Sequence, residues 1–300
     1  DEALQQRCMS ALEALLNRYP GNRCLVTSRY TAHQRPVVTQ LFQHAFVEAF
    51  NEGQVDEFFR RWMYALEKAE DLIEDHATKA KAEANAQAIL AHLRHKSELR
   101  ARLSTPFLCA LVGVTQHQAG HLPEQAVSLY KLCIDTLILH GDLMLRNEED
   151  SPSLERDEVL TILEHLALSA QQHNAPVFSA EQIYSEATAL LQNQGIPAAV
   201  AANKASCMRP WLEQDSALLS RVGSDHYAFT HVLFQEYLAA CALLKKPRTQ
   251  MIEILRQHLF LPHWRGVIRM AAAHQGAQDE GTGSAFIKLL QNYPHPHEDM

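Results

Sequence analysis

Residues 218–241 read LLSRVGSDHYAFTHVLFQEYLAAC, and the spacing of their apolar side chains changes part-way along. Two short apolar runs, 218–222 and 226–229, flank a glycine-containing turn at 223–225, which is typical of two strands joined as a hairpin. After the second run the apolar residues recur at helical spacing, and Thr230 is a reasonable N-cap for that helix. The stretch therefore predicts a small β-hairpin followed directly by a helix.

Helical patterns dominate the rest of the chain. The 300 residues include only 11 Gly and 12 Pro, too few for the frequent turns of an all-β protein. Helical stretches are expected before the hairpin at 159–170, 180–194 and 198–213, and paired helices after it at 249–291. Helices followed by a small hairpin describe a winged helix, so the predicted fold class is mainly α.

The middle of the chain is expected to hold a helical domain. Its Ala/Glu/Lys-rich stretch at 67–88 predicts a helical segment with a solvated middle. Pro106 is expected to open an apolar helix, because proline suits the first helical turn. The next helix is expected to stop near Gly141, and the acidic run at 147–152 is expected to be a linker.

A buried-strand run occurs near the start of the chain, where residues 23–29 read RCLVTSR after an amphipathic helix. Helix followed by buried strand is the order of a parallel α/β sheet, and a central strand needs hydrogen-bonded neighbours. Those strands are expected upstream of Asp1, which predicts that the chain is a segment of something longer. Ligands of such sheets bind beyond the carboxyl ends of the strands, so Arg29 is a candidate anion contact.

Charge and cysteine content favour a cytoplasmic protein without a membrane partner. The net charge of −8, from 35 acidic and 27 basic residues, disfavours a broad nucleic-acid or anionic-membrane face. No apolar run approaches the roughly 18 residues of a membrane-spanning helix. The six cysteines form no C-x-x-C pair, which predicts reduced core thiols.

Common enzyme signatures are mostly absent. The glycines provide no G-x-S-x-G elbow, no G-x-G-x-x-G turn and no G-x-x-x-x-G-K-[ST] phosphate loop, which argues against an unaided hydrolase. His117 and His121 are four residues apart but lack the glutamate of an H-E-x-x-H zinc motif, and the His-Pro-His-Glu run at 295–298 lies in a proline-rich tail. A metal site is not expected at either place.

Three motifs occur in order along the chain. They are CLVTSRY at 24–30, STPFLCALV at 104–112 followed by LPEQAVSLYKLCIDTLI at 122–138, and YAFTHVLFQEYLAA at 227–240. Together they resemble the NACHT module of bacterial STAND signalling NTPases, over about residues 1–275. The last motif is the most specific, because F-x-H-x-x-F-Q-E-Y-x-A-A is hard to reach by chance.

The resemblance implies an order of domains. In that family the end of a P-loop-type parallel α/β domain leads into a helical domain, a winged helix and a second helical domain. The implied boundaries are 1–50 for the C-terminal part of the nucleotide-binding domain, 51–146 for the helical domain, 147–246 for the winged helix, and 247–300 for the second helical domain or the start of helical repeats. The first of these would keep only an edge of the α/β sheet.

The resemblance also assigns roles to five residues. Asp1 and Glu2 would end the Walker B run, with Asp1 near Mg²⁺ and Glu2 polarising the attacking water. Arg29 matches the sensor that reads the γ-phosphate, Pro106 the proline that packs against adenine, and His231 the histidine that contacts the β-phosphate of ADP. Because no P-loop is present, slow hydrolysis of ATP is expected only in a full-length parent.

The implied function is a conformational switch. ADP would hold the domains closed until a signal at C-terminal repeats lets ATP replace it, and opening would expose a surface for self-oligomerisation. Bacterial relatives commonly act in defence against phage. Two alternatives stay open: a winged-helix DNA-binding regulator, although the helix near 198–213 carries only Lys204 and Arg209 against Glu213, and a helical adaptor that binds protein through 247–300 without nucleotide.

Overall fold

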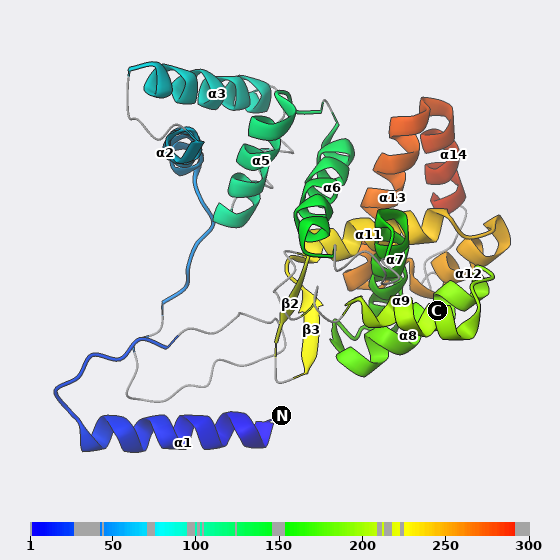
Figure 1. Cartoon of the computed structure of the whole chain (residues 1–300), viewed down its shortest axis with the longest axis horizontal. Coiled ribbons are helices and arrows are strands. Elements are labelled where there is room, and N and C mark those ends of the chain that lie inside the picture. The colour runs from blue at the N-terminus through cyan, green and yellow to red at the C-terminus, as the bar shows by residue number, and fades with distance from the viewer. Residues whose placement is uncertain are drawn as a thin grey trace. The chain divides into compact units, whose positions relative to one another are not determined.

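The computed structural model is mainly helical and divides into two compact units, residues 1–49 and 50–300 (Figure 1). It describes residues 2–26, 43, 45–70, 76–94, 100, 103, 105–123, 125–145, 154–208, 212, 218–222 and 225–291. The residues expected to form the linker at 147–152 lie outside these ranges, as do Thr27, Ser28 and Arg29.

The first unit contains the expected N-terminal helix, α1 (Glu2–Arg18), but not the expected strand over its described part. Residues 22–26 have no regular structure and are exposed, with Leu25 90% and Val26 48% accessible. A strand requires hydrogen-bonded neighbours, and the described residues of this unit supply none. The apolar run alone therefore gave the wrong local conformation for 23–26.

Four helices open the second unit: α2 (Glu52–Glu70), α3 (His76–Arg94), α5 (Pro106–Ala119) and α6 (Ala126–Leu145). Helices α2, α3 and α5 pack against one another and lie together in Figure 1. The prediction of a solvated helical segment at 67–88 holds for most of its described residues, but α3 turns one face inward, with Ala82 and Ala86 buried. Small alanine side chains let this helix approach α2 closely.

A buried carboxylate joins these three helices. Glu67 on α2 is fully buried, and its Oε1 accepts a hydrogen bond from Asn85 Nδ2 on α3 at 2.7 Å. Lys81 Nζ lies 2.5 Å from Oε2, and His117 Nδ1 on α5 lies 3.2 Å from Oε1. Partners on two helices offset the cost of burying this charge.

Helix α5 begins at Pro106 as the sequence predicts, whereas α6 does not end where it was expected to. Thr105 caps α5 with its Oγ1 accepting from the Leu108 amide at 3.4 Å, and Pro106 occupies the first turn. Gly120 ends the helix in the left-handed region, at φ 74°. Helix α6 continues through Gly141 to Leu145, because a single glycine weakens a helix by only about 1 kcal/mol and need not end it.

The next part of the chain contains three helices and a small sheet. In chain order its elements are α7 (Arg156–His173), β1 (Val177–Ser179), α8 (Ala180–Asn193), α9 (Ala198–Ser206), β2 (Leu219–Arg221) and β3 (His226–Phe229). The strand order is β1-β3-β2, with every pair antiparallel, so the predicted hairpin is confirmed. Strand β1, which pairs Phe178 with Tyr227, was not expected. In the part of the chain that the structure describes, this is the one sheet, and it is antiparallel and not the expected edge of a parallel sheet.

The hairpin leads into the C-terminal helices. These are α11 (Val232–Leu244), α12 (Arg248–His258), the short 3₁₀ helix η1 (Pro262–Trp264), α13 (Arg265–Gln278) and α14 (Glu280–Gln291), which confirms the expected helices at 249–291. Helix α11 packs against both α7 and α13 (Figure 1). Its buried residues cover most of its circumference, so it forms the centre of this part of the core.

Candidate functional site

Of the five residues assigned by resemblance, Pro106 and His231 have a described environment. Asp1 and Arg29 lie outside the described residues, and Glu2 begins α1 without a described side chain. Within the described ranges no group of three or more His, Cys, Asp or Glu side chains is placed to hold a metal ion. The His117 ring instead contacts the Glu67 carboxylate.

Pro106 and His231 are brought together by the residue that follows the proline. The ring of Phe107 lies parallel to the imidazole of His231, with centroids 6.0 Å apart and planes 12° apart. Phe234 meets both rings edge-on, at 5.9 Å from Phe107 and 6.2 Å from His231. We call Phe107, His231 and Phe234 the aromatic cluster. It joins the start of α5 to the start of α11.

His231, and not Thr230, is the N-cap of α11. Its Nδ1 accepts a hydrogen bond from the Leu233 amide at 3.2 Å, and its backbone is extended. Thr230 instead prolongs the sheet, donating its amide to the Leu218 carbonyl at 2.9 Å. The prediction of Thr230 as the cap is wrong because the hairpin continues one residue further than the apolar pattern of 226–229 indicates.

The cap fixes the tautomer of His231. A nitrogen that accepts a hydrogen bond carries no proton, so in the neutral ring the proton sits on Nε2. Burial lowers the pKa of His231 below its ordinary value of 6.5, which favours the neutral ring. His231 thus has one defined donor, Nε2–H, that its helix does not use.

Pro106 stands at the first turn of α5 with its ring exposed. A proline there sacrifices no helical hydrogen bond, because the first amides of a helix have no partner within it. The neighbouring Phe107 is half-buried, held on its other side by the fully buried Phe234. The site therefore presents an exposed apolar ring beside a partly exposed aromatic cluster.

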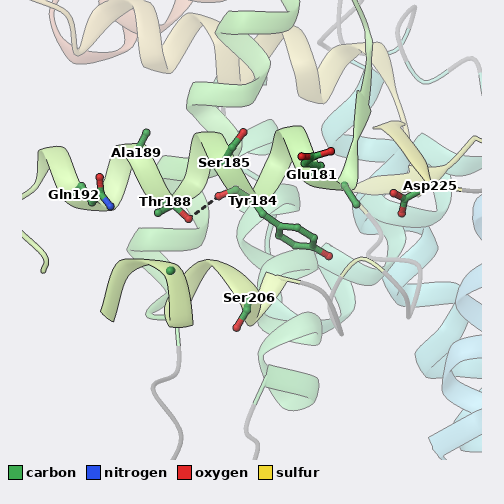
Figure 2. A pocket seen from close by; sticks show the side chains of 10 residues that line it. Glu181, Tyr184, Ser185, Thr188, Ala189, Gln192, Ser206 and Asp225 are labelled. Carbon is green, nitrogen blue, oxygen red and sulfur yellow. Dashed lines mark hydrogen bonds between the residues drawn. The ribbon is translucent and has the colours of Figure 1, made fainter. Parts of the chain in front are cut away.

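A groove of about 680 Å³ lies along one side of α8, apart from the aromatic cluster (Figure 2). Ten residues line it: Ala180, Glu181, Tyr184, Ser185, Thr188, Ala189, Gln192, Ala202, Ser206 and Asp225. Glu181 and Asp225 bring carboxylates to one end, where the Ala180 amide donates to the Asp225 carbonyl at 3.1 Å. None of the lining residues is cationic, so this groove is suited to a neutral or positively charged group and repels phosphate.

Lys204 on α9 does not add a cation to that groove. Its Nζ lies 2.6 and 2.8 Å from the two carboxylate oxygens of Glu158 on α7, and its side chain is 19% accessible. Of the two cations noted on the expected helix at 198–213, this one is already paired within the fold, and Arg209 lies outside the described residues.

No family model matches this chain, and no curated protein matches it. The assignment of the site therefore rests on the sequence motifs and on the geometry around Pro106 and His231. Sequence reasoning missed Phe107 and Phe234 as parts of the site. Both lie inside the quoted motifs, beside Pro106 and one turn after His231, but helical spacing assigns them equally well to the core.

Proposed function

We propose that this chain is part of a NACHT-type STAND NTPase, acting in the cytoplasm as a switch controlled by ADP and ATP. The observation that carries this proposal is the stack of Phe107, the residue after Pro106, on His231. It supports a site at which Pro106 contacts adenine and His231 contacts a phosphate. The order helix, strand, two helices and hairpin from α7 to β3 supports a winged helix at 147–246.

The chemistry of the site supports nucleotide recognition. Nε2–H of His231 can donate to an oxygen of the β-phosphate while Nδ1 keeps capping α11, so the helix does not lose its cap on binding. The exposed ring of Pro106 offers an apolar surface to a flat base. Protonation of the imidazole would place a proton on Nδ1 and break the cap, so the proposed contact uses the neutral ring with its proton on Nε2.

A histidine contact made only in the closed state would couple the nucleotide to the conformation. A ligand shifts a conformational equilibrium only by its difference in affinity for the two states. ADP held by His231 would keep the module closed, and its replacement by ATP would open a surface for self-oligomerisation. Asp1, Glu2 and Arg29 keep their proposed roles at Mg²⁺, the attacking water and the γ-phosphate, and antiphage defence remains the biological setting that the resemblance suggests.

DNA binding is supported less well. Lys204, the cation on α9, is paired with Glu158. The groove along α8 has two carboxylates and no cation among its lining residues. Both features oppose contact with a phosphate backbone. A gel shift at low salt with random duplex DNA checks this, and retention of the duplex would favour the DNA-binding alternative.

The test is nucleotide retention by the purified full-length protein that contains this chain. We expect near-stoichiometric ADP to be released on denaturation, little ADP from His231→Asn, and normal ADP from His226→Asn, an exposed histidine on β3. Asparagine also caps helices, so His231→Asn separates the loss of Nε2–H from loss of the cap. Absence of nucleotide, with no stabilisation by added ADP or ATP, overturns the proposal.

A further inference from the structure

Gln171, in the last turn of α7, connects three parts of the second unit through one buried side chain. It is 4% accessible. Its Oε1 accepts a hydrogen bond from Gln235 Nε2 on α11 at 3.0 Å, and its Nε2 donates to the His263 carbonyl in η1. Because a carbonyl only accepts, the orientation of the Gln171 amide is fixed by that second bond.

The main chain of Gln171 is held as well. Its carbonyl oxygen accepts from the indole Nε1 of Trp264 at 3.2 Å and lies 3.2 Å from Nε2 of His263. Trp264 is fully buried, and the ring of His258, in the last turn of α12, packs on it with centroids 4.5 Å apart. Gln171 is therefore bonded to η1, the segment between α12 and α13, and α12 contacts that segment through the ring of His258.

The same side chain leads back to His231. Gln235 lies one helical turn after His231, and its backbone N–H donates to the His231 carbonyl oxygen at 3.5 Å. Between them, Phe234 belongs to the aromatic cluster and is fully buried. Gln235 therefore belongs to the same first turn of α11 in which the imidazole of His231 caps the helix.

A second contact ties the same turn to α13. The carboxylate of Glu236 lies directly over Gly266, so close that a Cβ there would stand 1.9 Å from the carboxyl carbon. Gly266 is in the first turn of α13, whose amides favour a negative group. Consecutive residues of the F-Q-E-Y motif thus contact the end of α7 and the start of α13.

We propose that Gln171 is a positioning residue that links the C-terminal helices to His231. This proposal rests on the proposed function. Through its bonds to η1 and to Gln235, a movement of α12 and α13 changes the position of the first turn of α11, and with it the donor offered to the nucleotide. Buried amide networks suit this role, because every member must keep its partners or leave a polar group unsatisfied. The hydrogen bonds from η1 through Gln171 to Gln235 form one contiguous set.

The test reads His231 directly, without nucleotide. In this chain, histidine-labelled NMR gives the imidazole nitrogen shifts and the pKa of His231, with the His231→Asn variant identifying its signals among 17 histidines. We expect Gln171→Met and Trp264→Phe to shift the His231 nitrogen signals and to move its pKa toward 6.5. Gln172→Met, a neighbouring glutamine without those bonds, is the control and should leave both unchanged.

Trp264→Phe keeps an aromatic ring and removes one hydrogen bond, so it serves if Gln171→Met does not fold. His231 signals that are identical to the wild type in folded Trp264→Phe and Gln171→Met overturn the link, whatever the protein does with nucleotide. Coupled shifts in a full-length protein that retains no ADP would leave the link standing and overturn only the proposed function. Reduced ADP retention by Gln171→Met, with normal retention by Gln172→Met, would support both.

Discussion

The imidazole of His231 stacks on the ring of Phe107 with the two planes only 12° apart, and this contact connects helices that are far apart in the sequence. Each ring has a second reason for its position: Phe107 directly follows the exposed Pro106, and His231 caps α11 through Nδ1. The stack therefore holds one face of the imidazole while the cap holds one nitrogen. Only Nε2 is left for a ligand.

Replacing His231 separates the cap from the donor. His231→Ala removes the side chain that accepts from the Leu233 amide, and loss of an N-cap costs about 1 kcal/mol. His231→Asn should lose less, because asparagine restores the acceptor. Urea denaturation of this chain measures both, with His226→Ala as the exposed control. Equal losses for the two His231 variants would show that stacking, and not capping, is the contribution of His231 to stability.

The pH dependence of stability follows from the same residue. Burial lowers the pKa of His231 in the folded chain below 6.5, so between the two values the unfolded chain binds more protons. Its contribution to stability is complete above pH 6.5 and is lost as the pH falls through 6.5 toward the lowered value. We expect the wild type to lose more stability between pH 7.5 and 5.5 than His231→Asn. The two curves running parallel would contradict this.

An ion pair between the buried Glu164 of α7 and the exposed Lys245, which follows α11, gives a prediction of opposite sign. Glu164 is 5% accessible, and burial raises its pKa, while Lys245 Nζ lies 2.7 Å from both of its oxygens and opposes that rise. Lys245→Met leaves the buried carboxylate without its charged partner, at a cost of about 1 kcal/mol near neutral pH, because water screens the exposed ammonium.

The loss in Lys245→Met should shrink at acidic pH, because protonation of Glu164 removes the unpaired charge. A group with a raised folded pKa binds more protons when folded, so stability increases as the pH falls through that value. Lys131→Met removes an exposed lysine from Asp135 within α6 but leaves Asp135 paired with Arg156, so it is the control and should cost about 0.5 kcal/mol. A pH-independent loss in Lys245→Met would contradict the assignment to Glu164.

The sequence predicted local elements better than their partners. The hairpin at 218–229 and the proline-initiated helix at 106 follow from turn and cap chemistry, which acts over a few residues. Strand β1 escaped notice because three residues give no period to count, and β3 of the later hairpin supplies its partner. The strand predicted at 23–26 did not form for the opposite reason: these residues have the composition of a strand, but no neighbouring strand is described beside them.

The candidate site was half predictable. Pro106 and His231 stand at helix starts, which the sequence indicates, whereas the parallel stack through Phe107 depends on how α5 and α11 pack. The same holds for Gln171, which nothing in its local sequence separates from Gln172. Long-range contacts fixed its role, and periodicity carries no information on them.

A glycine pair between α13 and α14 provides a prediction independent of nucleotide. A Cβ at Gly283 would stand 2.7 Å from the Gly276 Cα and 3.0 Å from its amide nitrogen, so Gly283→Ala forces two backbones apart. Overpacking of this kind costs about 1–3 kcal/mol. Gly276→Ala is the matched control, because a Cβ there meets nothing within 4 Å and alanine favours a helix by about 1 kcal/mol. Thermal unfolding should therefore give a lowered Tm for Gly283→Ala and an unchanged or raised Tm for Gly276→Ala. A Gly283→Ala protein as stable as the wild type would show that α14 does not pack on α13 as closely as this geometry requires.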